Sequence, residues 1–120
     1  MAKDADDRFF KIENEARARC TLVRITGRLA SKNILSARKA LEEALTGGQT
    51  RICLDLSAVE YMDSMGIGLL VNFSKKVKGA GGSLVLANLS PTAADIIKVS
   101  GTGSFLEIHA GLTDPDQAFA

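Results

Sequence analysis

The feature that most constrains the fold is an alternation of two hydrophobic periods along the chain. Residues 51–57 (RICLDLS) form an apolar run whose alternate side chains face opposite sides of a strand, as in a strand near the middle of a sheet. Shortly afterwards, Gly66, Leu70, Phe73 and Val77 recur at helical spacing. Strands that alternate with helices predict an α/β domain with a mixed sheet of mostly parallel strands.

The same two periods predict the other elements, in the order β-β-α-β-α-β-α-β, with a last segment that begins like a further helix. The sheet therefore has four to five strands. The first two strands are separated by polar residues typical of a hairpin. The first helix covers residues 31–48, with Ser31 or Asn33 as its cap. The remaining expected elements are a strand at SLVLANL, a helix starting at Pro91, a strand at FLEIHAG and a helical start at Pro115.

Size and charge bound the domain organisation and the class of partner. A chain of 120 residues with 46% apolar composition fits one domain, which we place at 9–120 after a solvated tail at 1–8. The net charge of +1, with no Lys/Arg run, argues against binding nucleic acid or an acidic membrane surface. The N-terminus is too charged for a signal peptide, and no apolar stretch approaches the roughly 20 residues of a membrane span. We therefore expect a cytoplasmic protein.

Catalytic and metal-binding chemistry find little support in the sequence. His109 is the single histidine, and nothing in the sequence places it near a serine. Cys20 and Cys53 both lie in apolar runs and are expected to be buried thiols in a reducing compartment. The segment SMGIG lacks the spacing and the lysine of a phosphate-binding loop. We expect no enzyme activity, no cofactor and no metal.

The remaining signal is the corner where the apolar strand meets the second helix, at Asp63 and Ser64. In open α/β sheets, function gathers where helices begin at the carboxyl ends of strands. Two interpretations stay open: Ser64 is only a helix cap, or it accepts a phosphate. The helix dipole would favour a phosphate there and Asp63 would repel it, so phosphorylation should alter the surface more than the fold.

Two glycines in this helix need a reason, because each costs about 1 kcal/mol relative to alanine. Gly66 belongs to the buried stripe, where close packing of helix on sheet would explain it. Gly68 falls nearly opposite that stripe, so it is either a relic of a loose helix end or a place where another chain comes near. The second interpretation gives a docking surface of Met65, Gly68, Val71, Asn72 and Lys75.

The segment from the Leu-x-Leu strand end through MDSMGIGLL, the Gly-Gly turn and the Pro-started helix ending in Ser-Gly resembles the STAS domain family, as in bacterial anti-sigma factor antagonists. The resemblance runs from about Phe10 to Ala110. It implies helices packed mainly on one face of the sheet and no enzyme activity. It also implies that Ser64 is phosphorylated by a partner anti-sigma factor that is a serine kinase. The unphosphorylated form would bind that partner, phosphorylation would release it, and a phosphatase would restore binding. ATP would belong to the kinase.

The sequence departs from the family pattern at two places. Gly27-Arg28-Leu29-Ala30 stands where many antagonists carry an acid, so Arg28 joins Asp63 and Ser64 as a candidate partner contact. Met65 replaces a frequent second Ser or Thr, which leaves Ser64 as the hydroxyl of this corner. The alternatives are a STAS subunit of a transport complex or signalling scaffold without the switch, and a small enzyme or nucleotide-binding domain. The identity of the partner and the oligomeric state stay open.

Overall fold

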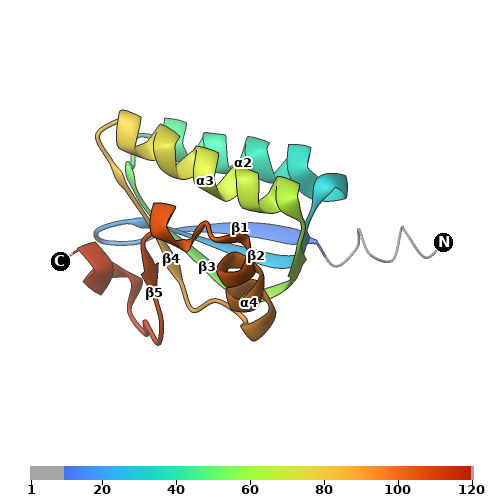
Figure 1. Cartoon of the computed structure of the whole chain (residues 1–120). Helices are drawn as coiled ribbons and strands as arrows, with labels where there is room; N and C mark the ends of the chain where they lie inside the picture. Colours follow the sequence, from blue (N-terminus) through green and yellow to red (C-terminus); the bar gives the residue numbers. More distant parts are fainter. Residues whose placement is uncertain (1–9, 120) are drawn as a thin grey trace.

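The computed structural model describes residues 10–119, and these build one five-stranded sheet with helices against it (Figure 1). The strands lie side by side in the order in which they follow along the chain. The first pair is antiparallel and all later neighbours are parallel, which confirms the predicted hairpin and the mixed α/β sheet. The strands are β1 (Lys11–Ala16), β2 (Thr21–Leu29), β3 (Arg51–Met62), β4 (Ser83–Ala87) and β5 (Ile108–His109).

Within residues 10–119 three α-helices connect the parallel strands: α2 (Ile34–Thr46), α3 (Ser64–Gly79) and α4 (Pro91–Ser100). Helices α2 and α3 lie side by side along one face of the sheet (Figure 1), and Lys76 Nζ lies 2.7 Å from Glu42 Oε2 across them. Helix α4 packs chiefly against β3. Short 3-10 turns complete the chain at η1 (Ser31–Asn33), η2 (Gly103–Phe105) and η3 (Pro115–Phe119).

The face of the sheet beneath the helices carries the main hydrophobic core. The stripe predicted for α3 is buried at all four of its positions, and α4 joins the same core through Ala93 and Ile97. Burying a leucine or phenylalanine side chain contributes about 1.5–3 kcal/mol. The helices therefore cover mainly one face, as the resemblance to the STAS family implied. The other buried members of α2 and β3 in this core are Ile34, Ala37, Leu41, Ala44, Ile52, Leu54, Leu56, Val59 and Met62.

The opposite face of the sheet holds a smaller cluster around the two cysteines. Cys20 and Cys53 are buried free thiols, as predicted, and Leu112 and Phe119 of the C-terminal segment pack against their cluster. Burial, reinforced by the carboxylate of Asp116, raises the pKa of Cys20 to about 12, and burial raises the pKa of Cys53 to about 11. Both thiols therefore stay protonated and unreactive in the folded protein.

Several element boundaries differ from the sequence prediction. β3 continues to Met62 instead of ending at Ser57, because β2 runs alongside it and pairs Arg28 with Tyr61 after two register shifts. β5 has two residues, since Gly103–Phe105 forms a 3-10 turn at the expected start of that strand. The last segment is a 3-10 turn, not an α-helix. The predicted tail at 1–8, together with residues 9 and 120 of the domain predicted at 9–120, lies outside the described residues.

Of the two residues predicted to cap the first long helix, Asn33 occupies the N-cap position and Ser31 does not. Asn33 holds the cap position of α2 without a side-chain bond to the helix; its Nδ2 instead donates to the carbonyl oxygen of Arg28 (2.9 Å). Ser31 lies further back, in a separate 3-10 turn. The glycine stop is confirmed, because Gly47 is the C-cap. Among residues 10–119, every helix is too short or too polar to cross a lipid bilayer.

Candidate functional site

The corner between β3 and α3 is built on the side chain of Asp63. This residue has an extended backbone (φ −104°, ψ −175°), and its Oδ1 accepts a hydrogen bond from the Gly66 amide at 3.0 Å. Asp63 is therefore the N-cap of α3, and Ser64 is the first residue inside the helix. The interpretation of Ser64 as a helix cap is wrong.

The second carboxylate oxygen of Asp63 ties a neighbouring loop to the corner. Its Oδ2 accepts a hydrogen bond from the Ser31 amide at 2.8 Å, so Asp63 joins the start of α3 to the segment that leaves β2. Burial alone would raise the pKa of Asp63, but the hydrogen bonds that it accepts from Ser31, Gly66 and Met65 outweigh burial and lower it. Asp63 is thus an ionised carboxylate held in one place near neutral pH.

Ser64 lies exposed at the start of α3. Within residues 10–119 its hydroxyl takes part in no hydrogen bond, ion pair or cap interaction, because Asp63 already satisfies the Gly66 amide. The fold therefore leaves this hydroxyl open to water and to another protein. A phosphate here would meet the positive end of the helix dipole and the negative charge of Asp63 together.

The two glycines of α3 have different reasons to be glycine. A Cβ on Gly66 would lie 1.9 Å from the backbone oxygen of Leu29, so the first turn of α3 touches the end of β2 backbone to backbone. This confirms close packing as the reason for Gly66. A Cβ on Gly68 would have no atom within 4 Å. Packing within the described chain does not demand glycine at position 68.

The predicted docking residues lie along the outer side of α3, though not all are open. Asn72 and Lys75 are exposed, and Met65 is 48% exposed. Gly68 and Val71 are half-buried, and Val71 also packs against the core. The surface is therefore more polar than the sequence suggested.

Arg28 lies at the same corner, although it belongs to another element. It is exposed on β2 opposite Tyr61 of β3, and its guanidinium carbon lies 5.2 Å from the centre of the Tyr61 ring. Such a contact is worth about 0.5–1 kcal/mol at an exposed site. Since Tyr61 precedes Met62 and Asp63, the structure brings Arg28 to the candidate site.

Sequence reasoning missed a groove between the start of α3 and the side of α4. Its volume is about 610 Å³, and Ser64 and Asp63 form part of its wall. Val99 of α4 lies in this groove and is 87% exposed. The sequence did offer one signal, because Val99 is an apolar residue outside the buried stripe formed by Ala93 and Ile97. Only the folded chain, however, places α4 beside Ser64. The groove is lined by Tyr61, Met62, Asp63, Ser64, Ile67, Asp95, Ile96, Val99 and Ser100.

The groups considered for catalysis or metal binding lie apart. His109 sits on the edge strand β5, where its Nε2 is 2.9 Å from Glu107 Oε2, and β4 separates this strand from β3 and the Ser64 corner. In the described part of the chain, no cluster of three or more His, Cys, Asp or Glu side chains could hold a metal ion. The arrangement around Ser64 offers a hydroxyl, a fixed carboxylate and an apolar groove, which are means of binding and of accepting a group.

The fold and this corner define a class of small α/β domain that presents one open serine where a helix leaves the sheet. The sequence model of the STAS domain matches residues 11–114. The chain belongs to the STAS domain family.

Similarity to individual proteins points in the same direction. An anti-sigma-B factor antagonist of Bacillus subtilis (strain 168) is 40% identical over 72 residues, which cover 60% of this chain and 64% of that protein. The match therefore spans slightly less than two thirds of that relative. An anti-sigma F factor antagonist of Paenibacillus polymyxa is 26% identical over 100 residues, or 82% of this chain and 86% of that protein.

Solved structures share the fold at low identity. An anti-sigma factor antagonist from Mycobacterium paratuberculosis superposes with a TM-score of 0.81 at 19% identity, covering 91% of this chain and 92% of the other. The anti-sigma factor antagonist SpoIIAA in its unphosphorylated form gives a TM-score of 0.72 at 23% identity, covering 91% and 93%. The phosphorylated form of SpoIIAA gives 0.68 at 23% identity, covering 91% and 96%. At these identities the likeness establishes the fold alone.

Proposed function

We propose that this protein is an anti-sigma factor antagonist whose binding is switched by phosphorylation of Ser64. The observation that carries the proposal is that Asp63, and not Ser64, caps the start of α3. Asp63 caps the helix and ties it to Ser31, so the exposed Ser64 hydroxyl is left without a structural role. A phosphate can be added to and removed from such a group without dismantling the fold.

The family relatives support the same reading. The Bacillus subtilis and Paenibacillus polymyxa relatives are named anti-sigma factor antagonists. SpoIIAA, which shares the fold, has been solved in an unphosphorylated and a phosphorylated form. We infer a cytoplasmic protein without enzyme activity or cofactor of its own, whose partner is an anti-sigma factor.

The finer part of the proposal concerns that partner. The anti-sigma factor would be a serine kinase that binds unphosphorylated protein, transfers a phosphate from its own ATP to Ser64 and then lets go. A phosphatase would restore binding. Contacts would come from the corner, the outer side of α3 and the groove beside α4. The residues concerned are Asp63, Ser64, Met65, Gly68, Val71, Asn72, Lys75 and Arg28, with Tyr61 and Val99 added from the groove.

The loss of partner affinity expected on phosphorylation of Ser64 follows from the charge of the phosphate. A phosphoserine carries about −1.5 to −2 charges near neutral pH. Burying it against a partner that cannot pair it costs several kcal/mol, and each 1.4 kcal/mol is tenfold in affinity. A loss of about a hundredfold is therefore expected without any refolding. Asp63 and Asp95 at the same groove add further negative charge and strengthen the effect.

The second candidate is a STAS interaction subunit without phosphorylation switching, in a transport complex or a signalling scaffold. It is favoured by Ala30, which stands where many antagonists carry an acid, by the basic Arg28 close to it, and by the Arg28–Tyr61 contact in this part of the corner. A different surface there would suit a different partner.

One comparison separates the two candidates. Ser64→Ala and Ser64→Asp proteins are used to recover partners from an extract of the native host, and each recovered protein is identified and tested for phosphate transfer to the wild-type chain. The switch predicts that Ser64→Ala retains a kinase of the anti-sigma class and that Ser64→Asp loses it. Ser83→Asp is the matched control, because Ser83 is exposed at the opposite ends of the parallel strands. Equal recovery by both Ser64 variants favours the scaffold.

A further inference from the structure

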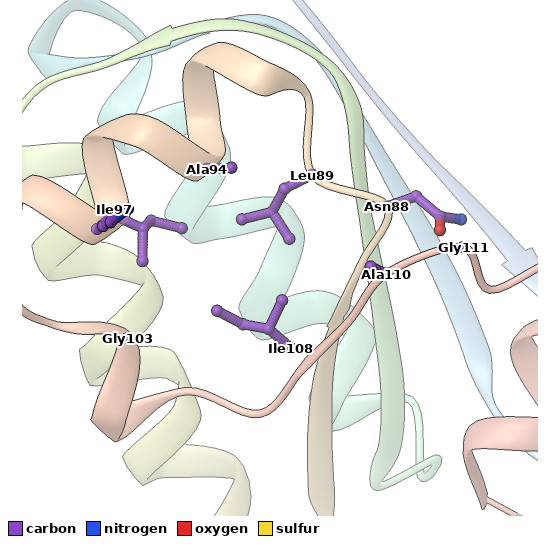
Figure 2. A pocket seen from close by; sticks show the side chains of 9 residues that line it. Asn88, Leu89, Ala94, Ile97, Gly103, Ile108, Ala110 and Gly111 are labelled. Carbon is purple, nitrogen blue, oxygen red and sulfur yellow. The ribbon is translucent and has the colours of Figure 1, made fainter.

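A second hollow lies on the other side of α4 from the Ser64 groove. It has a volume of about 570 Å³ and is bounded by α4, the segment after β4 and the edge strand β5. Figure 2 shows the side chains of Leu89, Ile97 and Ile108 turned toward this shared space. Its size falls within the range of about 300–1,000 Å³ typical of small-molecule sites.

The hollow follows from the way the edge of the sheet is built. Helix α4 packs against β3, and β5 pairs with β4 at only two positions. Ile108 of β5 stays 40% exposed, although it lines the same hollow as the buried Ile97 of α4. The small residues Ala94, Gly103 and Ala110 complete the wall and leave the space unfilled.

One wall of the hollow is fastened by Asn88, which has a left-handed backbone (φ 54°). Its Nδ2 donates to the Leu112 carbonyl and its Oδ1 accepts from the Leu112 amide, both at 2.7 Å. These bonds hold the Gly111 side of the hollow in place and occupy the polar atoms of Asn88. The charged residue left in the lining is Lys98, in the last turn of α4.

We propose that this hollow binds a small amphipathic carboxylate, of the kind represented by a medium-chain fatty acid. The hydrocarbon part would lie between Leu89, Ile97 and Ile108, where apolar surface is now in contact with water, and the carboxylate would lie beside Lys98. Removing apolar surface from water contributes about 25 cal/mol per Å². The charge of the lining selects an anionic head group over a neutral or cationic one.

This site is independent of the proposed switch. It lies on a different side of α4 from Ser64, and it shares no lining residue with the groove beside Ser64. If Ser64 is not a phosphorylation switch, the hollow would still bind the carboxylate. If Ser64 is such a switch, it does not follow that the hollow binds a carboxylate.

The test uses the full chain and three probes with the same tail: decanoate, decanol and decyltrimethylammonium, each below its micelle concentration. Binding is followed by methyl NMR of Leu89, Ile97 and Ile108. We expect saturable shifts at these methyl groups, with decanoate about two- to fivefold tighter than decanol, the size of an ion pair at a solvent-accessible rim. Decyltrimethylammonium is expected to be the weakest.

Two variants locate the site. Ala94→Trp fills the hollow from an exposed position and should weaken decanoate at least about tenfold, whereas Ala80→Trp at the end of α3 should not. Lys98→Glu should remove the preference for decanoate over decanol. Lys78→Glu is its matched control, because Lys78 occupies the last turn of α3 as Lys98 occupies that of α4.

Absence of saturable shifts at the three methyl groups would overturn the proposal. So would unchanged binding by a folded Ala94→Trp protein. If Ala94→Trp does not fold, the Lys98→Glu protein decides. Equal binding of all three probes by the wild-type chain, unaffected by Lys98→Glu, would overturn the assignment of the carboxylate.

Discussion

The helices that follow β3 and β4 both begin with serine nearby, and the two serines do opposite things. At α4, Ser90 is itself the N-cap: its Oγ accepts from the Ala93 amide (3.1 Å) and donates to the Val59 carbonyl oxygen (2.6 Å). At α3, a carboxylate caps the helix, and Ser64 follows it with an exposed hydroxyl. The comparison teaches that a serine becomes available for modification when a neighbour takes over its structural task.

The largest expected effect concerns the third position of each helix, which is Gly66 in α3 and Ala93 in α4. Helix α4 accommodates a buried methyl group there, whereas α3 touches the backbone of Leu29. Gly66→Ala should lower the free energy of unfolding by about 3 kcal/mol, the upper end for overpacking. Urea denaturation measures the change. Gly68→Ala is the control and should raise stability by up to about 1 kcal/mol, because nothing obstructs its Cβ. A neutral Gly66→Ala would mean that α3 does not approach β2 so closely.

The next effect compares the two serines directly. Ser90→Ala removes a cap and leaves the Val59 carbonyl without its donor, so it should cost about 1–2 kcal/mol. Ser64→Ala removes no bond among the described residues and should change stability by less than about 0.5 kcal/mol. Urea midpoints at unchanged slope give both values. Equal losses for the two variants would break the comparison.

A smaller effect separates a charged cap from a neutral one. Asp63→Asn keeps an oxygen for the Gly66 amide but turns an N–H donor toward the Ser31 amide, which is itself a donor, so we expect a loss of about 1 kcal/mol at pH 7. The folded pKa of Asp63 lies below its ordinary value. Its contribution is therefore complete above the unfolded pKa of about 3.9 and is lost as pH falls through the folded pKa.

Stability measured against pH checks this prediction. The difference between wild type and Asp63→Asn should shrink as pH falls below about 4. The difference between wild type and Ser90→Ala should keep its size over the same range, because a hydroxyl cap does not titrate there. A pH-independent loss for Asp63→Asn would contradict the role of its charge.

The smallest effect is expected from adding charge at Ser64 itself. In Ser64→Asp, attraction to the helix dipole and repulsion from Asp63 partly cancel, so the free energy of unfolding should change by less than about 0.5 kcal/mol. Backbone NMR shifts should stay confined to the corner. Widespread shifts would mean that a charge at Ser64 acts by changing the conformation and not only the surface.

Sequence patterns predicted the type and order of most helices and strands, because those patterns lie within each element. The stripe through Gly66, Leu70 and Phe73 and the Pro91 start of α4 are written in neighbouring residues, and all are confirmed. The sequence placed Ser64 correctly at the strand-to-helix corner. The interpretation of Ser64 as the cap is wrong, because the Gly66 amide donates to Asp63 instead.

The features that were missed depend on residues far apart in the sequence. β3 extends to Met62 because the end of β2 lies beside it, and the bond from Ser31 to Asp63 joins segments that only the fold brings together. The groove between Val99 and Ser64 has the same origin. A pattern in one segment cannot report on the partner that another segment supplies.

The two buried thiols make local opening of the folded protein measurable by chemical labelling. An alkylating reagent can reach Cys20 or Cys53 only when the sheet or the C-terminal segment over it comes away. The labelling rate of each cysteine therefore reports how often its part of the molecule opens. If the partner proposed above binds the Ser64 corner and makes opening rarer, both labelling rates should fall although neither sulfur atom is contacted.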